Sequence, residues 1–340
     1  MEKLILVKTL TQLNQLKEVV KNAISNSEFI AFDTETTGVD RGSEIIGFSI
    51  CTEMETAYYV ILSYYDKAKQ QLVELETKAE AASFLSLLTQ SNLVMHNAVF
   101  DCSQVEVNFG VKLMPTTHTD TMLLAHIIDE NRRVGLKELA VSIFGEDSKK
   151  EQTEMKASII ANGGSTTLGK YELYKADADL IGTYGAKDAL LTLKLFYHFI
   201  PQLFEQELDN FFYEETMPLL RGPTDDLNTT GLMVDPDKLQ RLKGELEAEC
   251  AAAKAFIYNE INAEVSHKYP GTKPSNTFNI GASKQLSWLL FGQLNNEFLC
   301  LTKGGRELCK AVGIPVPYAP KAKRDFIKFC IDNIGTVYEE

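Results

Sequence analysis

The sequence predicts an α/β fold, a mixed sheet covered by helices, which is followed by a mainly helical region. Three observations support this prediction. Short apolar, β-favouring runs fall within the first hundred residues, strand and helix patterns then alternate, and strand patterns nearly vanish after Pro201. Strands followed by strand-and-helix alternation are typical of a sheet with helices packed on its faces. We therefore place one domain at residues 1–205 and a helical region at residues 206–340.

The composition is that of an ordinary globular protein, with 340 residues, 44% hydrophobic residues and a net charge of −13. This acidic balance argues against a protein that passively coats DNA, but not against an enzyme whose acids hold metal ions. The six cysteines form no C-x-x-C pair, as expected in a reducing compartment. No apolar run is long enough for a signal peptide or a membrane span. We expect a cytoplasmic protein without a membrane segment.

The chain begins with a predicted strand at residues 4–8 and a helix that reaches about Ser25, capped by Thr9 or Thr11. Three β-rich runs follow, and their short connections predict an antiparallel meander. These runs are residues 29–36, 44–52 and 56–62.

Two acids stand one residue apart at the end of the first of these three strands. Residues i and i+2 of a strand lie on one face, so Asp33 and Glu35 leave the strand on the same side. Two like charges held so close repel each other, and a cation between them resolves the repulsion. An isolated D-x-E is usually a solvated strand end, so the interpretation depends on the motifs that follow.

The second acidic motif follows a predicted helix at residues 78–90, capped by Thr77, and a predicted strand at residues 92–97. Asn97 and Asp101 stand four residues apart where this strand becomes a helix, so they share one helical face. The strand can lie beside the first acidic strand. Taken alone, Asp101 is more simply explained as an acid that satisfies the helix dipole.

The third motif lies on a long helix predicted from about Asp177 to Phe204, which carries Tyr184 and Asp188 four residues apart. Before it, residues 118–144 are predicted to form two helices. Residues 145–172 are polar and are predicted to form an exposed, mobile excursion.

The C-terminal third is predicted to be helical. A long amphipathic helix begins at Asp235 and Pro236, and another is capped by Ser283. Residues 301–328 form a basic stretch in an otherwise acidic chain, which is most simply a solvated surface.

The ordered set D-x-E, N-x-x-x-D and Y-x-x-x-D resembles the DEDD superfamily of 3′–5′ exonucleases, in its tyrosine-bearing branch. The histidine branch is disfavoured, because no histidine lies between His126 and His198. Three ordered motifs at these separations rarely match by chance. The resemblance implies a ribonuclease H-like fold and metal-dependent removal of 5′-mononucleotides from a DNA 3′ end.

The similarity extends to family A DNA polymerases, the group of bacterial DNA polymerase I. The segments HTDTMLLAHII and GLKELA resemble the region between the second and third motifs, and ETMPLLRGPTDDLNTTGLMVD and FNIGASKQLSWLLF resemble the start of the thumb. No palm or fingers motif follows residue 300. We therefore expect an exonuclease with an incomplete thumb, proofreading for a polymerase whose palm and fingers lie on a separate chain, as in a split phage polymerase in the host cytoplasm, or else a fragment of a longer polymerase.

The resemblance also implies roles for individual residues. Two Mg²⁺ ions, with Mn²⁺ as a substitute, would be held by the four acids: Asp33 bridges both ions, Glu35 and Asp188 complete the water-activating site, and Asp101 holds the second ion. Tyr184 would orient the attacking water. The residues that would contact the terminal nucleotides of a single-stranded 3′ end or primer-template are Thr36, Val39, Asn97 and Phe100.

Two alternatives remain open at this point. A ribonuclease D-like exoribonuclease would use the same five residues, although the thumb-like segments argue against it. A catalytically inactive scaffold that orders a polymerase is the other alternative, but such scaffolds usually lose one or more acids, and all four are present here.

Overall fold

The computed structural model describes residues 2–145, 149–167, 169–260, 279 and 281–282. The chain divides into two compact units, Met1–Leu232 and Met233–Glu340. The helix predicted after Ser283 and the basic stretch at residues 301–328 lie outside the described residues.

A six-stranded mixed sheet forms the centre of the first unit, in the order β1-β4-β3-β2-β7-β8. Its strands are β1 (Lys3–Val7), β2 (Phe29–Thr36), β3 (Ile45–Glu53), β4 (Thr56–Ile61), β7 (Asn92–Met95) and β8 (Thr117–Asp120). The antiparallel meander β2-β3-β4 is confirmed. Strand β7 runs parallel to β2, and β8 runs parallel to β7. The carboxyl ends of β2 and β7 therefore lie at the same end of the sheet.

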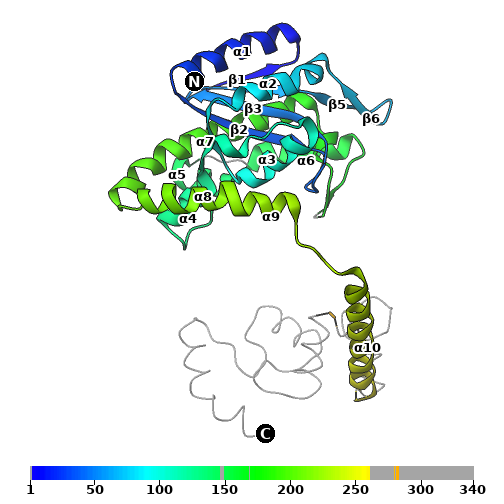
Figure 1. The fold of residues 1–340 in the computed structure, drawn as a ribbon. Helices are drawn as coiled ribbons and strands as arrows, with labels where there is room; N and C mark the ends of the chain where they lie inside the picture. The colour runs from blue at the N-terminus through cyan, green and yellow to red at the C-terminus, as the bar shows by residue number, and fades with distance from the viewer. Residues whose placement is uncertain (1, 146–148, 168, 261–278, 280, 283–340) are drawn as a thin grey trace, which may run out of the picture. The chain divides into compact units, whose positions relative to one another are not determined.

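The remaining elements are two small hairpins and the helices. The hairpins pair β5 (Ser63–Asp66) with β6 (Gln71–Glu74), and β9 (Thr166–Thr167) with β10 (Lys170–Tyr171). The helices of the first unit are α1 (Leu10–Ser25), α2 (Ala81–Leu88), α3 (Ala98–Phe109), α4 (Thr121–Ile128), α5 (Leu136–Phe144), α6 (Lys149–Ala161), α7 (Ala178–Glu205), α8 (Met217–Leu219) and α9 (Asp225–Thr230). Figure 1 shows strands β1, β2 and β3 between helices α1 and α7.

Hydrophobic side chains cover both faces of the sheet, and alternation along β2 divides them. Ile30 and Phe32 join a core with helices α1 to α4, whereas Ala31 joins a second core beneath α7. By the same alternation, Asp33 and Glu35 face α7. Thr34 faces the side of α3. The two cores thus determine which helix meets each side chain at the end of β2.

Two helix starts show how local hydrogen bonds set the boundaries. Thr9 caps α1 in a capping box with Gln12, as predicted. The predicted cap Thr77 is wrong. Its hydroxyl donates instead to the carbonyl of Ile61, and α2 begins at Ala81, after the 3₁₀ turn η1 (Glu76–Glu80).

The structure differs from the prediction between residues 117 and 172. Residues 117–120 form strand β8 rather than the start of a helix. The excursion at residues 145–172 contains α6, whose Met155 and Ile159 are buried against the core beneath α7. Two apolar residues four positions apart are enough to dock this mainly polar helix.

The first unit continues to Leu232, beyond residue 205, where the sequence analysis placed the domain boundary. Phe212, Met217 and Leu220 are buried in the same core as α1 and α4. The helical segment after α7 therefore packs with the sheet domain.

The second unit contains α10 (Pro236–Glu260), the predicted amphipathic helix. Its residues Leu239, Leu242 and Leu246 are exposed to solvent. Among the described residues, no helix combines the length and the hydrophobicity that crossing a membrane requires.

Candidate active site

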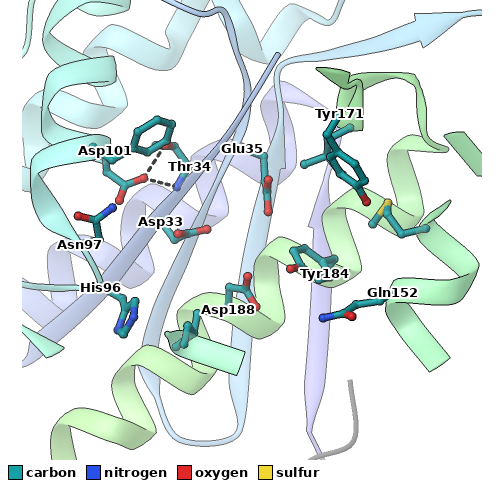
Figure 2. A pocket seen from close by; sticks show the side chains of 14 residues that line it. Asp33, Thr34, Glu35, His96, Asn97, Asp101, Gln152, Tyr171, Tyr184 and Asp188 are labelled. Atoms are coloured by element: carbon teal, nitrogen blue, oxygen red, sulfur yellow. Dashed lines mark hydrogen bonds between the residues drawn. The ribbon is translucent and has the colours of Figure 1, made fainter. Parts of the chain in front are cut away.

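The first pair of acids lies at the carboxyl end of β2. Asp33 and Glu35 share one face of the strand, and Glu35 is 8% exposed while Asp33 reaches further towards the cavity. The pairing of β2 with β3 shifts between Glu35 and Thr36. The strand ends at Thr36, just after the two acids, and their side chains point towards Tyr184 and Asp188 (Figure 2).

Asp101 approaches from the first turn of α3 and is 2% exposed. Its Oδ1 accepts hydrogen bonds from the Thr34 backbone nitrogen at 2.9 Å and from Thr34 Oγ1 at 2.5 Å. The carboxylate is thus bound to β2. The simpler explanation of Asp101, as an acid that only satisfies its own helix, does not account for these two bonds.

Asn97 begins α3 in the left-handed backbone conformation, with φ of 65°. Asp120, at the end of β8, accepts hydrogen bonds from the backbone nitrogens of Asn97 at 3.2 Å and Ala98 at 2.8 Å. The same carboxylate also caps α4. Because Asp120 fixes this junction, it determines where Asp101 stands on α3.

Asp188 and Tyr184 come from α7, which lies close to the sheet because two of its residues are glycines. A Cβ atom at Gly185 would lie 2.7 Å from Cδ2 of Tyr59, and one at Gly182 would lie 3.1 Å from Cδ1 of the same ring. This close approach brings Asp188 to the β2 acids. Single carboxylate oxygens of Asp33, Glu35 and Asp188 all lie within 4.8 Å of one another.

Lys137 of α5 reaches into the same cluster and forms an ion pair with Asp188. Its Nζ also lies 4.0 Å from the centroid of the Tyr184 ring. The lysine supplies positive charge to the acids in the metal-free protein, and it contacts both members of the third motif.

Burial raises the pKa values of these acids. Loss of solvent raises the pKa of Asp33 from 3.8 to about 7, although the nearby Lys137 lowers it. Burial, and then the neighbouring charge of Asp33, raise the pKa of Glu35 and of Asp101 well above their ordinary values. Three carboxyls that resist ionisation side by side form a site that favours a bound cation.

The acids open into a cavity of about 340 Å³. Asp33, Glu35, Asp101, Tyr184 and Asp188 all line it, together with Asn97 and Phe100 from the predicted nucleotide contacts. Thr36 and Val39 do not. Thr36 is buried, with its hydroxyl donating to the Gly38 carbonyl at 2.6 Å, and Val39 is 85% exposed on the following loop.

Residues 5–203, more than half of the chain, match the protein family described as 3′–5′ exonuclease. The chain belongs to this family. Its mixed sheet with flanking helices is the ribonuclease H-like exonuclease fold.

Three curated relatives of this 3′–5′ exonuclease are DNA polymerases. DNA polymerase I of Chloroflexus aurantiacus is 28% identical over 80% of this chain and 26% of its own length. DNA polymerase I of Borreliella burgdorferi is 26% identical over 85% of this chain and 28% of its own length. The DNA polymerase of Escherichia phage T5 is 25% identical over 82% of this chain and 31% of its own length. The chain thus spans less than a third of the length of these relatives.

Two solved structures resemble the exonuclease chain. The polymerase domain of Pol1 from M. smegmatis, in complex with DNA primer-template and dNTP, matches 95% of this chain and 48% of that chain, with a TM-score of 0.50 and 18% identity. Escherichia coli RNase D covers 71% of this chain and 54% of that chain, with a TM-score of 0.45 and 15% identity. At these identities, the likeness concerns the fold alone.

Several residues of this exonuclease that contact the acids or line the cavity were not identified from the sequence, and among them Lys137 contacts Asp188 and Tyr184. Lys137 belongs to the GLKELA segment, but one lysine on an amphipathic helix has no distinguishing spacing. Four further lining residues lie in or just after the excursion, namely Gln152, Met155, Tyr171 and Leu173, and Figure 2 shows Gln152 and Tyr171 on one side of the cavity. Their position could not be predicted, because it depends on how α6 docks.

The donor set of this exonuclease fits a divalent metal. Carboxylate oxygens are hard ligands, which suit Mg²⁺ and Mn²⁺, and the oxygens within 4.8 Å of one another come from three separate side chains. Asp101 adds a fourth carboxylate at the same cavity. Burial raises the pKa values of Asp33, Glu35 and Asp101, and a cation would stabilise the ionised forms that burial disfavours.

Proposed function

We propose that this chain is a metal-dependent 3′–5′ DNA exonuclease that removes 5′-mononucleotides from a single-stranded 3′ end and proofreads for a family A DNA polymerase. The observation that carries the proposal is the convergence of Asp33, Glu35 and Asp188 within 4.8 Å, in a cavity that Asp101 also lines. These residues come from three segments far apart in the sequence.

The proposed cofactor is a pair of Mg²⁺ ions, for which Mn²⁺ can substitute. Asp33, Glu35, Asp101 and Asp188 would hold them. When bound, two such ions activate water on one side of the phosphorus and stabilise the leaving oxygen on the other.

The remaining cavity residues would bind and orient the substrate. Tyr184, next to Glu35 and Asp188, would orient the attacking water through its hydroxyl. Asn97 and Phe100 line the cavity and would contact the terminal nucleotide, with the Phe100 ring available to a base. Thr36 and Val39 remain predicted contacts for the terminal nucleotides.

DNA is the proposed substrate because the curated relatives are DNA polymerases. The primer-template is the form in which a polymerase would present the 3′ end. The partial thumb in residues 206–340 and a separate chain with palm and fingers remain predictions. Co-purification of this protein with a chain that contains palm and fingers would test the prediction of a separate chain.

The decisive experiment follows 5′-labelled single strands of DNA and RNA of one sequence. With Mg²⁺ or Mn²⁺, the DNA should shorten stepwise from its 3′ end and release 5′-mononucleotides, while EDTA should stop the reaction. Full-length DNA in both metals would refute the proposal. Faster shortening of the RNA strand would favour the ribonuclease D-like alternative.

A further inference from the structure

A second, open groove of about 670 Å³ lies beside the acidic cavity. The same two chain segments line the cavity and the groove. At the end of β2, Glu35 faces the cavity and Thr37 lines the groove; in the segment before α7, Leu173 faces the cavity and Tyr174 lines the groove. The cavity and the groove therefore adjoin along these two segments, so that a strand held in the cavity could extend along them into the groove.

Two tyrosines form the apolar part of this groove. Tyr65 lies on strand β5 of the β5–β6 hairpin, and β5 contacts the 3₁₀ turn η3 (Leu173–Lys175), which carries Tyr174. Their ring centroids are 6.0 Å apart, with an angle of 79° between the ring planes. Both side chains are half-buried, so part of each ring remains open to a ligand.

Hydrogen bonds hold this aromatic pair in place. The Tyr174 hydroxyl donates to Glu172 Oε1 at 3.0 Å, and Glu172 Oε2 accepts from the Ser165 backbone nitrogen at 2.8 Å. A ring fixed before binding loses little conformational freedom when a ligand stacks on it.

The groove also contains a positive charge. Lys175 Nζ lies 5.7 Å from the Tyr65 ring centroid and 5.8 Å from the Tyr174 centroid. Lys175 also pairs with Glu172 at 2.9 Å, so a phosphate would share this lysine with Glu172, and Glu44 pairs with Lys78 at 2.6 Å. The groove is therefore not an acidic metal site like the cavity beside it.

We propose that this groove binds the nucleotides on the 5′ side of the nucleotide being removed, with bases stacked on Tyr65 and Tyr174 and a phosphate near Lys175. Aromatic stacking with a nearby cation is the usual means of holding a single strand without sequence preference. The exposed side chains of Gln70 and Gln71 offer amides at the groove edge. The inference rests on the proposed function, because it assumes a single-stranded nucleic acid in the cavity.

The test measures binding rather than turnover. The probe is a 5′-fluorescein-labelled thymidine octamer with phosphorothioate linkages, which resist hydrolysis, titrated in Mg²⁺ and followed by anisotropy. A thymidine phosphorothioate dinucleotide, measured by competition, reports the acidic cavity. The double variant Tyr65→Ala/Tyr174→Ala should weaken octamer binding relative to dinucleotide binding by about 5- to 140-fold for each stacked base that is lost.

Tyr64→Ala is the matched control. Tyr64 precedes Tyr65 on the hairpin, points to the other face and does not line the groove. It should keep the wild-type ratio of octamer to dinucleotide affinity. The inference would be overturned if the double variant had the same ratio of octamer to dinucleotide affinity as the wild type, whether or not both affinities fell.

A milder substitution tests the charge. Lys175→Gln should reduce the slope of log affinity against log salt for the octamer by about 0.7, as expected when one phosphate contact to a single strand is lost. An unchanged slope would overturn the phosphate contact. If octamer binding depends on the tyrosines but an ordinary octamer is never cleaved, the proposed function fails and the groove is a site of single-strand binding alone.

Discussion

At the scale of single residues, the site depends on carboxylates that repel one another unless a cation is present. Asp188→Asn keeps the size of the side chain and removes its charge. We expect the rate of DNA cleavage to fall by about 100-fold or more, because a metal ligand is lost from the cluster. Gel analysis of single-strand shortening measures this.

The control for Asp188→Asn is Asp179→Asn, an exposed acid in the first turn of the same helix. It should cleave DNA at the wild-type rate. If the rate of DNA cleavage fell equally in both variants, the effect would come from a general change in α7 rather than from the loss of a carboxylate in the cluster.

Tyr184 is the cavity residue whose predicted role is to orient water. Tyr184→Phe removes only the hydroxyl and keeps the ring beside Lys137. The rate of cleavage should fall by roughly 10–1000-fold, the scale of losing one positioning or proton-handling group, while metal binding measured by calorimetry stays intact. Tyr197→Phe, on an exposed part of α7, is the control. Wild-type rates for Tyr184→Phe would make Tyr184 a structural residue.

The raised pKa values predict how stability depends on pH in the metal-free protein. The Asp33 carboxyl ionises near 3.8 in the unfolded chain and at about 7 in the folded protein. Between these values the folded state holds a proton that the unfolded state has released. The free energy of unfolding should therefore fall as pH rises from about 4 to 7. Above pH 7 this loss of stability is complete, because Asp33 is then ionised in both states.

A cation reverses this loss, since it stabilises the ionised carboxylates of the folded state. Mg²⁺ should accordingly raise Tm more at pH 8 than at pH 5, relative to the same protein in EDTA. Thermal unfolding at both pH values measures the difference. An equal rise at pH 5 and pH 8 would contradict the link between metal binding and ionisation of the cluster.

At the scale of elements, the position of α7 over the sheet decides whether the third motif meets the first. Gly185→Ala would place a methyl group 2.7 Å from the fully buried Tyr59 ring. Overpacking of this kind costs about 1–3 kcal/mol, which exceeds or matches the gain of about 1 kcal/mol from the higher helix propensity of alanine. Tm and the cleavage rate should both fall, because the new Cβ also lies 3.4 Å from Glu35 Cγ.

Gly222→Ala is the control for this prediction, since a Cβ there meets no atom within 4 Å. It should leave Tm unchanged or slightly higher. An unaltered Tm in Gly185→Ala would show that α7 has room to move away from β2.

The elements that sequence reasoning found are those with a strong period or cap. Helix α1 has its capping box and apolar face, and α7 has the N-cap Asp177 and a long apolar face. Strand β8 was missed because the side chains it buries include threonines and an aspartate, Thr117, Thr119 and Asp120, which give no apolar pattern. Helix α6 was missed because, among its residues with described side chains, Met155 and Ile159 are the buried ones.

The same reasoning applies to the site. Asp33 and Glu35 could be paired from strand alternation alone, because their relation is local. Lys137 and Tyr171 meet the acids only through the packing of α5 and of the β9–β10 hairpin, which no local spacing specifies. Sequence therefore identified the acids, but not the further residues around them.

At the scale of the whole molecule, the first compact unit ends at Leu232 rather than near residue 205. Phe212, Met217 and Leu220 complete the core that contains α1 and α4. Burying an apolar side chain of this size stabilises a fold by about 1.5–3 kcal/mol. A domain that stops before these three residues would leave the core open at α4.

Two shortened chains test where the catalytic unit ends. A chain of residues 1–232 should fold, unfold cooperatively and cleave single-stranded DNA at a rate close to that of the full chain, because every residue of the cavity lies within it. A chain of residues 1–205 should have a clearly lower Tm, because it lacks the three core residues. Calorimetry and the cleavage assay compare them directly. If both chains have the same Tm, the segment from Phe212 to Leu220 does not belong to the core of the catalytic unit, and the boundary near residue 205 is correct.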